Sequence, residues 1–184
     1  MNNLFKFLYR KRSEYYAGLI KKYIREKNRI LDIGAGSGYI AEILSKNADI
    51  TLLDVKDYNQ TNLPLKIYDG KKIPYKDKSF DAALLLTVFH YIKDQPGFLK
   101  DVKRVCNRII LIDDVYKTSF GWLMVNFNDS IISNSVGIYT KFNFLTEKEF
   151  KSLFRALKLK IVDSKEIRSF LRLTKQKIYV LENG

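Results

Sequence analysis

The feature that most constrains the fold is a glycine-rich turn between a short apolar run and a helical stretch. The segment reads ILDIGAGSGY and covers residues 30–39. Residues 29–33 are typical of a buried strand, and glycines then follow at every second position. Residues 39–45 continue with the spacing of a helix. A strand, a glycine turn and a helix in this order indicate a parallel βαβ unit, with the turn at the ligand-binding edge of the sheet.

The same alternation of strands and helices continues through most of the chain. We expect further strands at 50–54, 65–68, 81–87 and 108–112, and helices at 14–26 and 97–107. Ser13 is the expected cap of the first helix. The order predicts an α/β fold with a doubly wound parallel sheet in one domain, 1–184, which includes an N-terminal helical segment, 1–27.

The alternation of strands and helices ends after Asp114. Residues 115–145 are rich in aromatic and asparagine side chains and have no clear period, so we expect an insertion there. Thr146 and Glu149 then form a capping-box pattern that opens another helix. Two last strands are expected near 159–163 and 177–182.

Composition limits the compartment and the covalent chemistry. The single cysteine, Cys106, excludes an internal disulfide and favours a reducing compartment. No apolar run is long enough to span a membrane, and the start, MNNLFKFLYRKR, reverses the charge order of a secretory signal. We therefore expect a cytoplasmic protein.

The net charge of +13 is concentrated on the two flanks of the chain. Residues 1–30 carry +7 and residues 140–184 carry +6, whereas residues 31–139, with the glycine turn, are neutral. Basic flanks could attract RNA, an anionic membrane surface or an acidic small molecule. The alternative is an ordinary solvated, lysine-rich surface.

Carboxylates lie at the ends of the first two strands, where a ligand would meet the glycine turn. Glycines at 34, 36 and 38 leave the backbone open to close approach by a ligand. Asp54 ends the second strand and can accept hydrogen bonds from both hydroxyls of a ribose. Asp32 ends the first strand, where it would repel a pyrophosphate but suits a cationic group.

At this point the chain resembles the class I S-adenosylmethionine-dependent methyltransferases, in particular the small-molecule, ubiquinone/menaquinone-type branch. ILDIGAGSGYIAEIL, ITLLD and IPYKDKSFDAALLLTVFHYIKD carry the resemblance, which extends over roughly 28–184. It implies a Rossmann-like, seven-stranded, three-layer fold, mostly parallel with an antiparallel last strand. It also implies S-adenosyl-L-methionine as cofactor, held by Asp32, Gly34, Gly36, Gly38, Asp54, Val55, Asp69, Gly70 and Thr87, with Asp69 and Gly70 at the adenine.

Candidates for catalysis are few. His90, just past the fourth strand, is either a base or acceptor contact or a structural histidine that hydrogen-bonds a loop carbonyl. Asp113 and Asp114 could reach the acceptor, although capping or solvation is the preferred interpretation. Cys106 is expected to pack a helix against the sheet. No Cys or His spacing suggests a metal.

The acceptor is expected to be chosen by residues 115–145, where Trp122 and Asn126 could supply an apolar wall and a polar contact. The alternative is ordinary core packing. Residues 4–12 could close over the site, lie on a membrane surface or fray. The sequence thus predicts a methyltransferase for a small or lipid-like molecule. The alternatives are an RNA methyltransferase and a non-catalytic cofactor-binding or interaction protein.

Overall fold

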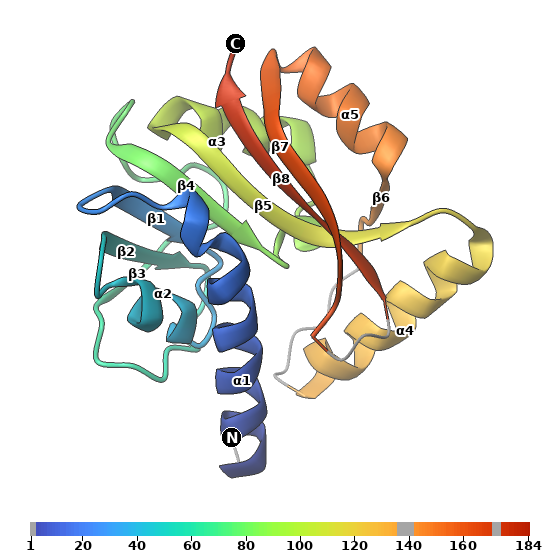
Figure 1. The fold of residues 1–184 in the computed structure, drawn as a ribbon, viewed down its shortest axis with the longest axis horizontal. Helices are drawn as coiled ribbons and strands as arrows, with labels where there is room; N and C mark the ends of the chain where they lie inside the picture. Colours follow the sequence, from blue (N-terminus) through green and yellow to red (C-terminus); the bar gives the residue numbers. More distant parts are fainter. Residues whose placement is uncertain (1–2, 136–141, 171–173) are drawn as a thin grey trace.

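The computed structural model describes residues 3–135, 142–170 and 174–184, and it shows a twisted sheet with helices on both faces (Figure 1). The strand order is β3-β2-β1-β4-β5-β8-β7, and the short β6 pairs with β5 off this path. The strands are β1 Arg29–Ile33, β2 Asp49–Asp54, β3 Leu65–Ile67, β4 Phe80–Leu86, β5 Cys106–Tyr116, β6 Leu145–Thr146, β7 Leu159–Arg168 and β8 Lys175–Asn183. The helices are α1 Asn3–Ile20, α2 Tyr39–Leu44, α3 Gln95–Val105, α4 Ser119–Ser135 and α5 Glu147–Ala156, with short 3-10 turns η1 Lys21–Tyr23 and η2 Phe89–Tyr91.

Most strand pairs are parallel, and β8 is the exception because it runs antiparallel to both β5 and β7. The expected mostly parallel sheet with an antiparallel last strand is thereby confirmed. The strand order reverses at β1, whose neighbours are β2 and β4. In open α/β sheets, ligands bind beside the carboxyl ends of the strands at such a reversal.

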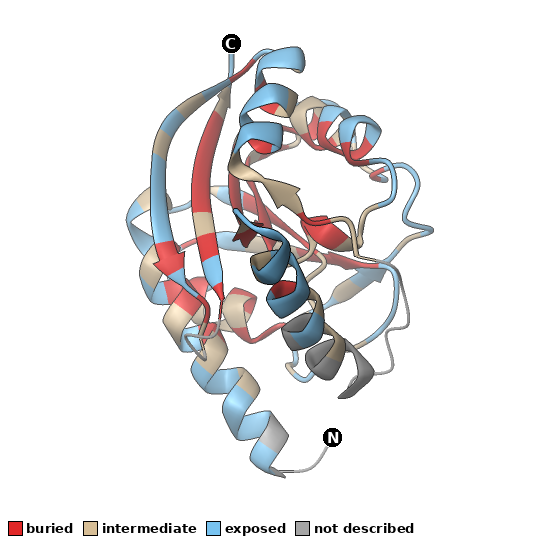
Figure 2. Cartoon of the chain, turned by 90° about the vertical axis from the view of Figure 1, so that its right-hand side faces the viewer, coloured by how far each residue is buried: buried red, intermediate tan, exposed pale blue. Residues whose placement is uncertain are grey.

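Each face of the sheet packs against its own set of helices. In β1, Ile30 belongs to the hydrophobic cluster that includes α1 and α2, whereas its neighbour Leu31 belongs to the cluster that includes α3 and α5. This alternation follows from the period of two along a strand. Figure 2 shows the strands largely buried between helices whose outer faces are exposed.

Several boundaries differ from those expected, among them the end of β7, expected near 163 but found at Arg168. The first helix begins at Asn3, so Ser13 lies inside it and does not cap it. The Ser13 hydroxyl donates to the Tyr9 carbonyl (2.9 Å). β5 extends to Tyr116, because Asp113 and Asp114 continue its pairing with β8. Much of the stretch 115–145 is the helix α4; residues 136–141 of that stretch lie outside the described residues.

Other elements follow the sequence closely. β1 has the expected bounds, and Thr146 and Glu149 form the capping box at the start of α5. Asp94 caps α3 by accepting a hydrogen bond from the Gly97 amide. Cys106, expected between a helix and the sheet, is buried in the core as the first residue of β5. Among the described residues, no helix is both long and apolar enough to cross a bilayer.

Candidate active site

A cavity of about 1140 Å³ opens at the carboxyl ends of β1, β2 and β4, with α1 along one side. Its walls combine the glycine turn, the carboxylates of Asp32 and Asp54, and a set of aromatic and aliphatic side chains. The cavity therefore lies at the edge that the reversal of strand order predicts.

The three glycines of the turn have positive φ angles but serve different purposes. A Cβ on Gly34 would lie 2.4 Å from Val88 Cγ2, and one on Gly38 would lie 2.4 Å from Asn59 Oδ1. These two glycines allow neighbouring segments to pack. A Cβ on Gly36 would approach only the Gly34 carbonyl, at 3.9 Å. Since Gly36 lines the cavity, its missing side chain leaves room for a ligand on the backbone.

Asp54 is held in a fixed orientation by backbone amides. Its Oδ2 accepts a hydrogen bond from the Gly36 amide (2.8 Å) and its Oδ1 from the Val55 amide (2.7 Å). Burial raises the pKa of Asp54, and these amides act against the rise. Each carboxylate oxygen has a further lone pair, so the side chain can accept two more hydrogen bonds from a bound diol.

Asp32 is in a different situation, because none of the described residues donates a hydrogen bond to its carboxylate. The side chain is only 3% exposed and lines the cavity. Burial, together with the nearby charge of Asp54, raises its pKa to about 7. A buried carboxylate without donors is stabilised by a cation. The ammonium group of an amino acid has the required charge and hydrogen-bond donors.

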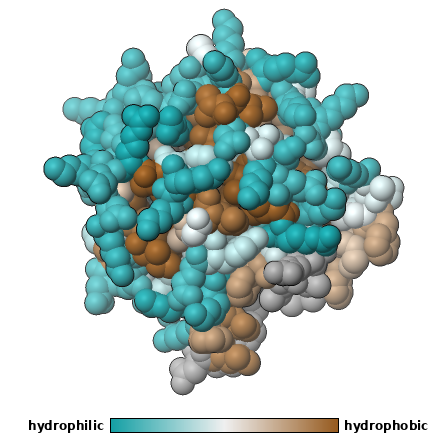
Figure 3. All heavy atoms as spheres, in the orientation of Figure 1, coloured by the Kyte–Doolittle hydropathy of each residue, from teal (hydrophilic) through white to brown (hydrophobic). Residues whose placement is uncertain are grey.

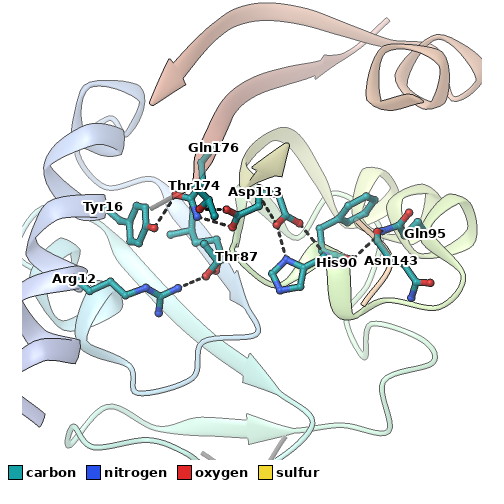
Figure 4. A network of polar contacts seen from close by, with 12 residues as sticks. Arg12, Tyr16, Thr87, His90, Gln95, Asp113, Asn143, Thr174 and Gln176 are labelled. Atoms are coloured by element: carbon teal, nitrogen blue, oxygen red, sulfur yellow. Dashed lines mark hydrogen bonds and ion pairs between the residues drawn. The ribbon is translucent and has the colours of Figure 1, made fainter. Parts of the chain in front are cut away.

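One expectation for residues 4–12 is that they close over the site, and α1 does bring Tyr9, Arg12, Ser13 and Tyr16 to the cavity, although no sequence motif singled out these side chains. Arg12 Nη2 donates to Thr87 Oγ1 (2.5 Å), and the guanidinium lies over the ring of Tyr16, 5.3 Å from its centroid (Figure 4). No carboxylate of the described chain forms an ion pair with Arg12. Its charge is therefore available to an anionic ligand.

A buried chain of hydrogen bonds fixes this end of the cavity to the sheet. The Tyr16 hydroxyl donates to Gln176 Oε1 (2.7 Å), and Gln176 Nε2 donates to Asp114 Oδ2 (2.8 Å). Thr174 donates to the other oxygen of Asp114 (Figure 4). Thr87 itself adopts a positive φ of 57°, which is unusual for a β-branched residue and is typical of constrained functional positions.

Asp113 and Asp114 are buried, so the expectation of capping or solvation is wrong. Burial raises the pKa of Asp114 to about 6, although the hydrogen bonds from Thr174 and Gln176 oppose the rise. Asp113 accepts from the backbone amide of His90 (2.9 Å), and its other oxygen lies 2.5 Å from Nδ1 of the same residue. Both carboxylates are held within the protein.

His90 itself is not among the residues that line the cavity. Its ring is 1% exposed, and it stacks on Phe144 with centroids 4.6 Å apart. The partner of Nδ1 is the Asp113 carboxylate, not a loop carbonyl (Figure 4). The ring is thus held between Asp113 and Phe144, away from the cavity lining.

The remaining predicted site residues fall into two groups. Val55, Gly70 and Thr87 line the cavity with Gly34, Gly36 and the two carboxylates. Four residues do not: Gly38, which packs against Asn59; Asp69, whose carboxylate accepts from the Lys71 amide (3.0 Å); Trp122, which is 47% exposed; and Asn126, which donates to the Trp122 carbonyl (2.7 Å). Their roles stay predictions. In the described part of the chain, no cluster of His, Cys, Asp or Glu could hold a metal ion.

Comparison with known proteins agrees with this geometry. Residues 8–164 match a family described as "Methyltransferase domain". The chain belongs to this family. The methyltransferase domain accounts for the glycine turn, the strand order and the cavity described above, and its cofactor is S-adenosylmethionine.

Individual relatives of the methyltransferase are distant. The chain is 31% identical over 84 residues to the mitochondrial arginine-hydroxylase NDUFAF5 of Danio rerio, which covers 41% of this chain and 26% of that protein. It is 28% identical over 145 residues to the uncharacterized protein MJ1123 of Methanocaldococcus jannaschii, which covers 77% and 68% of the two chains. The chain thus spans only about a quarter of the first relative and about two thirds of the second.

Solved structures agree at the level of the fold. The crystal structure of a SAM-dependent methyltransferase from Methanosarcina mazei superposes with a TM-score of 0.67 at 21% identity, over 90% of this chain and 96% of that one. At this identity, the likeness shows the fold alone. The choice of acceptor must be argued from the cavity.

Proposed function

We propose that the protein transfers the methyl group of S-adenosylmethionine to a small or lipid-like acceptor bound in the same cavity. The observation that carries this proposal is the size and continuity of the cavity. Its volume of about 1140 Å³ exceeds the roughly 300–1,000 Å³ typical of a site for one ligand, and it is continuous from the glycine turn to aromatic walls. Room for a second molecule favours an acceptor that enters the protein.

The residues at the glycine turn suit the polar parts of the cofactor. Asp32 would orient the ammonium group, Asp54 would accept hydrogen bonds from the ribose hydroxyls, and the Gly36 backbone would lie against the ligand. Arg12 is suited to a carboxylate, since guanidinium and carboxylate form paired hydrogen bonds. One cavity thus holds a carboxylate for the ammonium group, Asp32, and a guanidinium for the carboxylate group, Arg12, which together fit the amino-acid part of the cofactor.

When bound, S-adenosylmethionine supplies a methyl group that its sulfonium centre has already activated. The protein then needs to align the acceptor with the methyl group and exclude water, which is a matter of positioning. Tyr16, Tyr91 and Phe98 offer aromatic surface for this purpose along the cavity. A base is needed only for an acceptor that loses a proton, and the position of His90 outside the cavity lining does not support it in that role.

RNA methylation is a second candidate because of the net charge of +13. The neutral central part of the chain and the position of α1 beside the cavity favour a small acceptor. Methyl transfer to RNA, beyond the salt-sensitive binding that the net charge alone predicts, would support the RNA alternative. A protein that binds cofactor without turnover would support the non-catalytic alternative.

The test is label transfer from methyl-labelled cofactor to a cell extract. The extract is separated after reaction into organic-soluble, small polar, RNA and protein fractions. We expect the label in the organic-soluble or small polar fraction. Label in RNA or protein, or demethylated cofactor released with no labelled product, would contradict the proposal.

Matched variants identify the site responsible. Asp54→Ala should abolish most transfer and weaken cofactor binding by at least ~1 kcal/mol, the scale of a lost hydrogen bond to a charged group. Asp49→Ala is the control, because Asp49 is an exposed carboxylate at the opposite end of the same strand. Equal transfer by the two variants would place the cofactor elsewhere.

A further inference from the structure

Large apolar side chains are exposed mainly on two helices. Of the eleven that the described chain exposes, eight lie on α1 and α4: Leu4, Phe7, Leu8, Phe120, Trp122, Leu123, Met124 and Phe127. We call this set the helix rim. Phe120 is 70% exposed and Leu4 is 63% exposed, so these residues are far outside the core. Soluble surfaces rarely concentrate apolar side chains in this way without a partner.

Both helices lie at the edge of the sheet where the cavity opens. α4 begins at Ser119, three residues after the end of β5, and α1 contacts Thr87 just after β4 through Arg12. Figure 1 shows the first half of α1 projecting beyond the sheet, and α4 running from beside the end of β5 toward that same end of the molecule. In Figure 3 apolar atoms appear at that end.

The exposed residues form continuous stripes. On α4, Phe120, Leu123, Met124 and Phe127 have the spacing of one helical face, while Val125 on another face is 2% exposed. On α1, Leu4, Phe7 and Leu8 have the same spacing and are exposed. The apolar residues of α1 that pack into the core lie in its second half. One face of each helix is therefore folded but lacks a partner among the described residues.

Charge indicates what could cover these faces. Lys6, Arg10 and Lys11 are exposed beside the apolar residues of α1, and Lys117 is exposed just before α4. Arg10 and Lys11 pair with Glu42 and Glu14, but such exposed pairs are weak. Residues 1–30 still carry +7. Aromatic and leucine side chains interleaved with lysine and arginine are the pattern of a helix that lies in an anionic membrane interface.

We propose that the helix rim binds the surface of an anionic phospholipid bilayer, with its apolar side chains among the headgroups and the basic residues of α1 against lipid phosphates. α1 lines the cavity, and α4 begins beyond the carboxyl end of β5, at the same edge of the sheet, so this orientation turns that edge toward the bilayer. The binding needs no cofactor. It suits a lipid-like acceptor, but it does not depend on the proposed methyl transfer.

The apolar part is tested by sedimentation of the full chain, without cofactor, with vesicles of phosphatidylcholine alone or mixed with phosphatidylglycerol. We expect binding to the mixed vesicles only. Phe120→Ser combined with Leu123→Ser should weaken it by at least about tenfold. The control is Ile67→Ser combined with Val162→Ser, since these two exposed apolar residues lie on β3 and β7, away from the rim. Circular dichroism verifies that each variant is folded.

The basic part is tested by charge reversal. Lys6→Glu with Lys11→Glu should also weaken binding, whereas Lys160→Glu with Lys165→Glu, the same change in charge on β7, should not. Equal binding to neutral vesicles would overturn the proposal. Vesicle binding that is weakened by the lysine variant but not by the serine variant would also overturn it, because it would indicate a polyanion such as RNA as the partner. A dimer that the serine variant dissociates would do the same, because it would indicate a second copy of the chain.

These experiments test the methyl-transfer proposal and the membrane-binding proposal independently. Vesicle binding without any labelled product would leave the membrane surface in place and remove the methyl-transfer proposal. Labelled product without vesicle binding would do the reverse.

Discussion

The carboxylate of Asp32 is buried from solvent in the cofactor-free protein, yet it lines the cavity where it can contact a cation. Its pKa is raised to about 7, so the free protein holds a proton there at lower pH. An ammonium ligand needs the carboxylate, and binding is therefore coupled to loss of that proton. We expect affinity for the cofactor to fall about tenfold per pH unit below the pKa. Calorimetry at about pH 8 and about pH 6 measures the change; Asp32→Asn should bind weakly with a flat pH profile.

The same residue has the opposite effect on stability. The pKa of Asp32 is higher in the folded chain than the value of about 4 for an unfolded one. Its contribution favours folding below about pH 4 and is lost as the pH rises through about 7. Asp32→Asn should therefore raise the melting temperature of the cofactor-free protein at about pH 8. An unchanged or lower melting temperature at that pH would show that a donor compensates the carboxylate.

Gly36 provides a steric test at the same scale. Gly36→Val should abolish cofactor binding, because the side chain would extend into the cavity that the open backbone leaves. Its φ of 54° also strains any branched residue, so folding is monitored by circular dichroism. Gly18→Val, at an exposed and unobstructed position of α1, is the comparison. Retained affinity in Gly36→Val would exclude a ligand passing over this backbone.

At the scale of elements, α1 reaches the cavity as one of the expectations for residues 4–12, but no sequence motif indicated Arg12. Arg12→Ala should lower cofactor affinity by about tenfold if the guanidinium binds the carboxylate of its amino-acid group. Arg25→Ala removes an exposed arginine just beyond the helix and should change nothing. Calorimetry and acceptor kinetics together separate the two possible ligands: a normal cofactor affinity with a raised KM for the acceptor would assign Arg12 to the acceptor.

Elements differ in how far local sequence determines them. β1 and the capping box of α5 could be predicted because they depend on near neighbours along the chain. The extension of β5 through Asp113 could not, since its pairing partner on β8 lies far away in the sequence. The site divides in the same way: the glycine turn and Asp54 follow from one βαβ unit, whereas Arg12 reaches the cavity from a separate helix.

At the scale of the whole molecule, the net charge of +13 should produce RNA binding without turnover. We expect this binding to be indifferent to sequence and to weaken steeply with salt, because it would depend on phosphate contacts alone. Filter binding across a salt series measures it. Added RNA should leave methyl transfer to the small-molecule fraction unchanged. Strong inhibition of this transfer by RNA would indicate that RNA occupies the acceptor site.

The hydrogen bond between Tyr16 and Gln176 joins residues 160 positions apart. During translation, the first helix leaves the ribosome long before the strand that supplies its partner. Contacts across such a separation form late and slow the folding of a chain. The site should accordingly mature only after β8 has been synthesised and inserted beside β5. A nascent chain arrested before β8 would then carry the glycine turn and both acids yet fail to retain the cofactor.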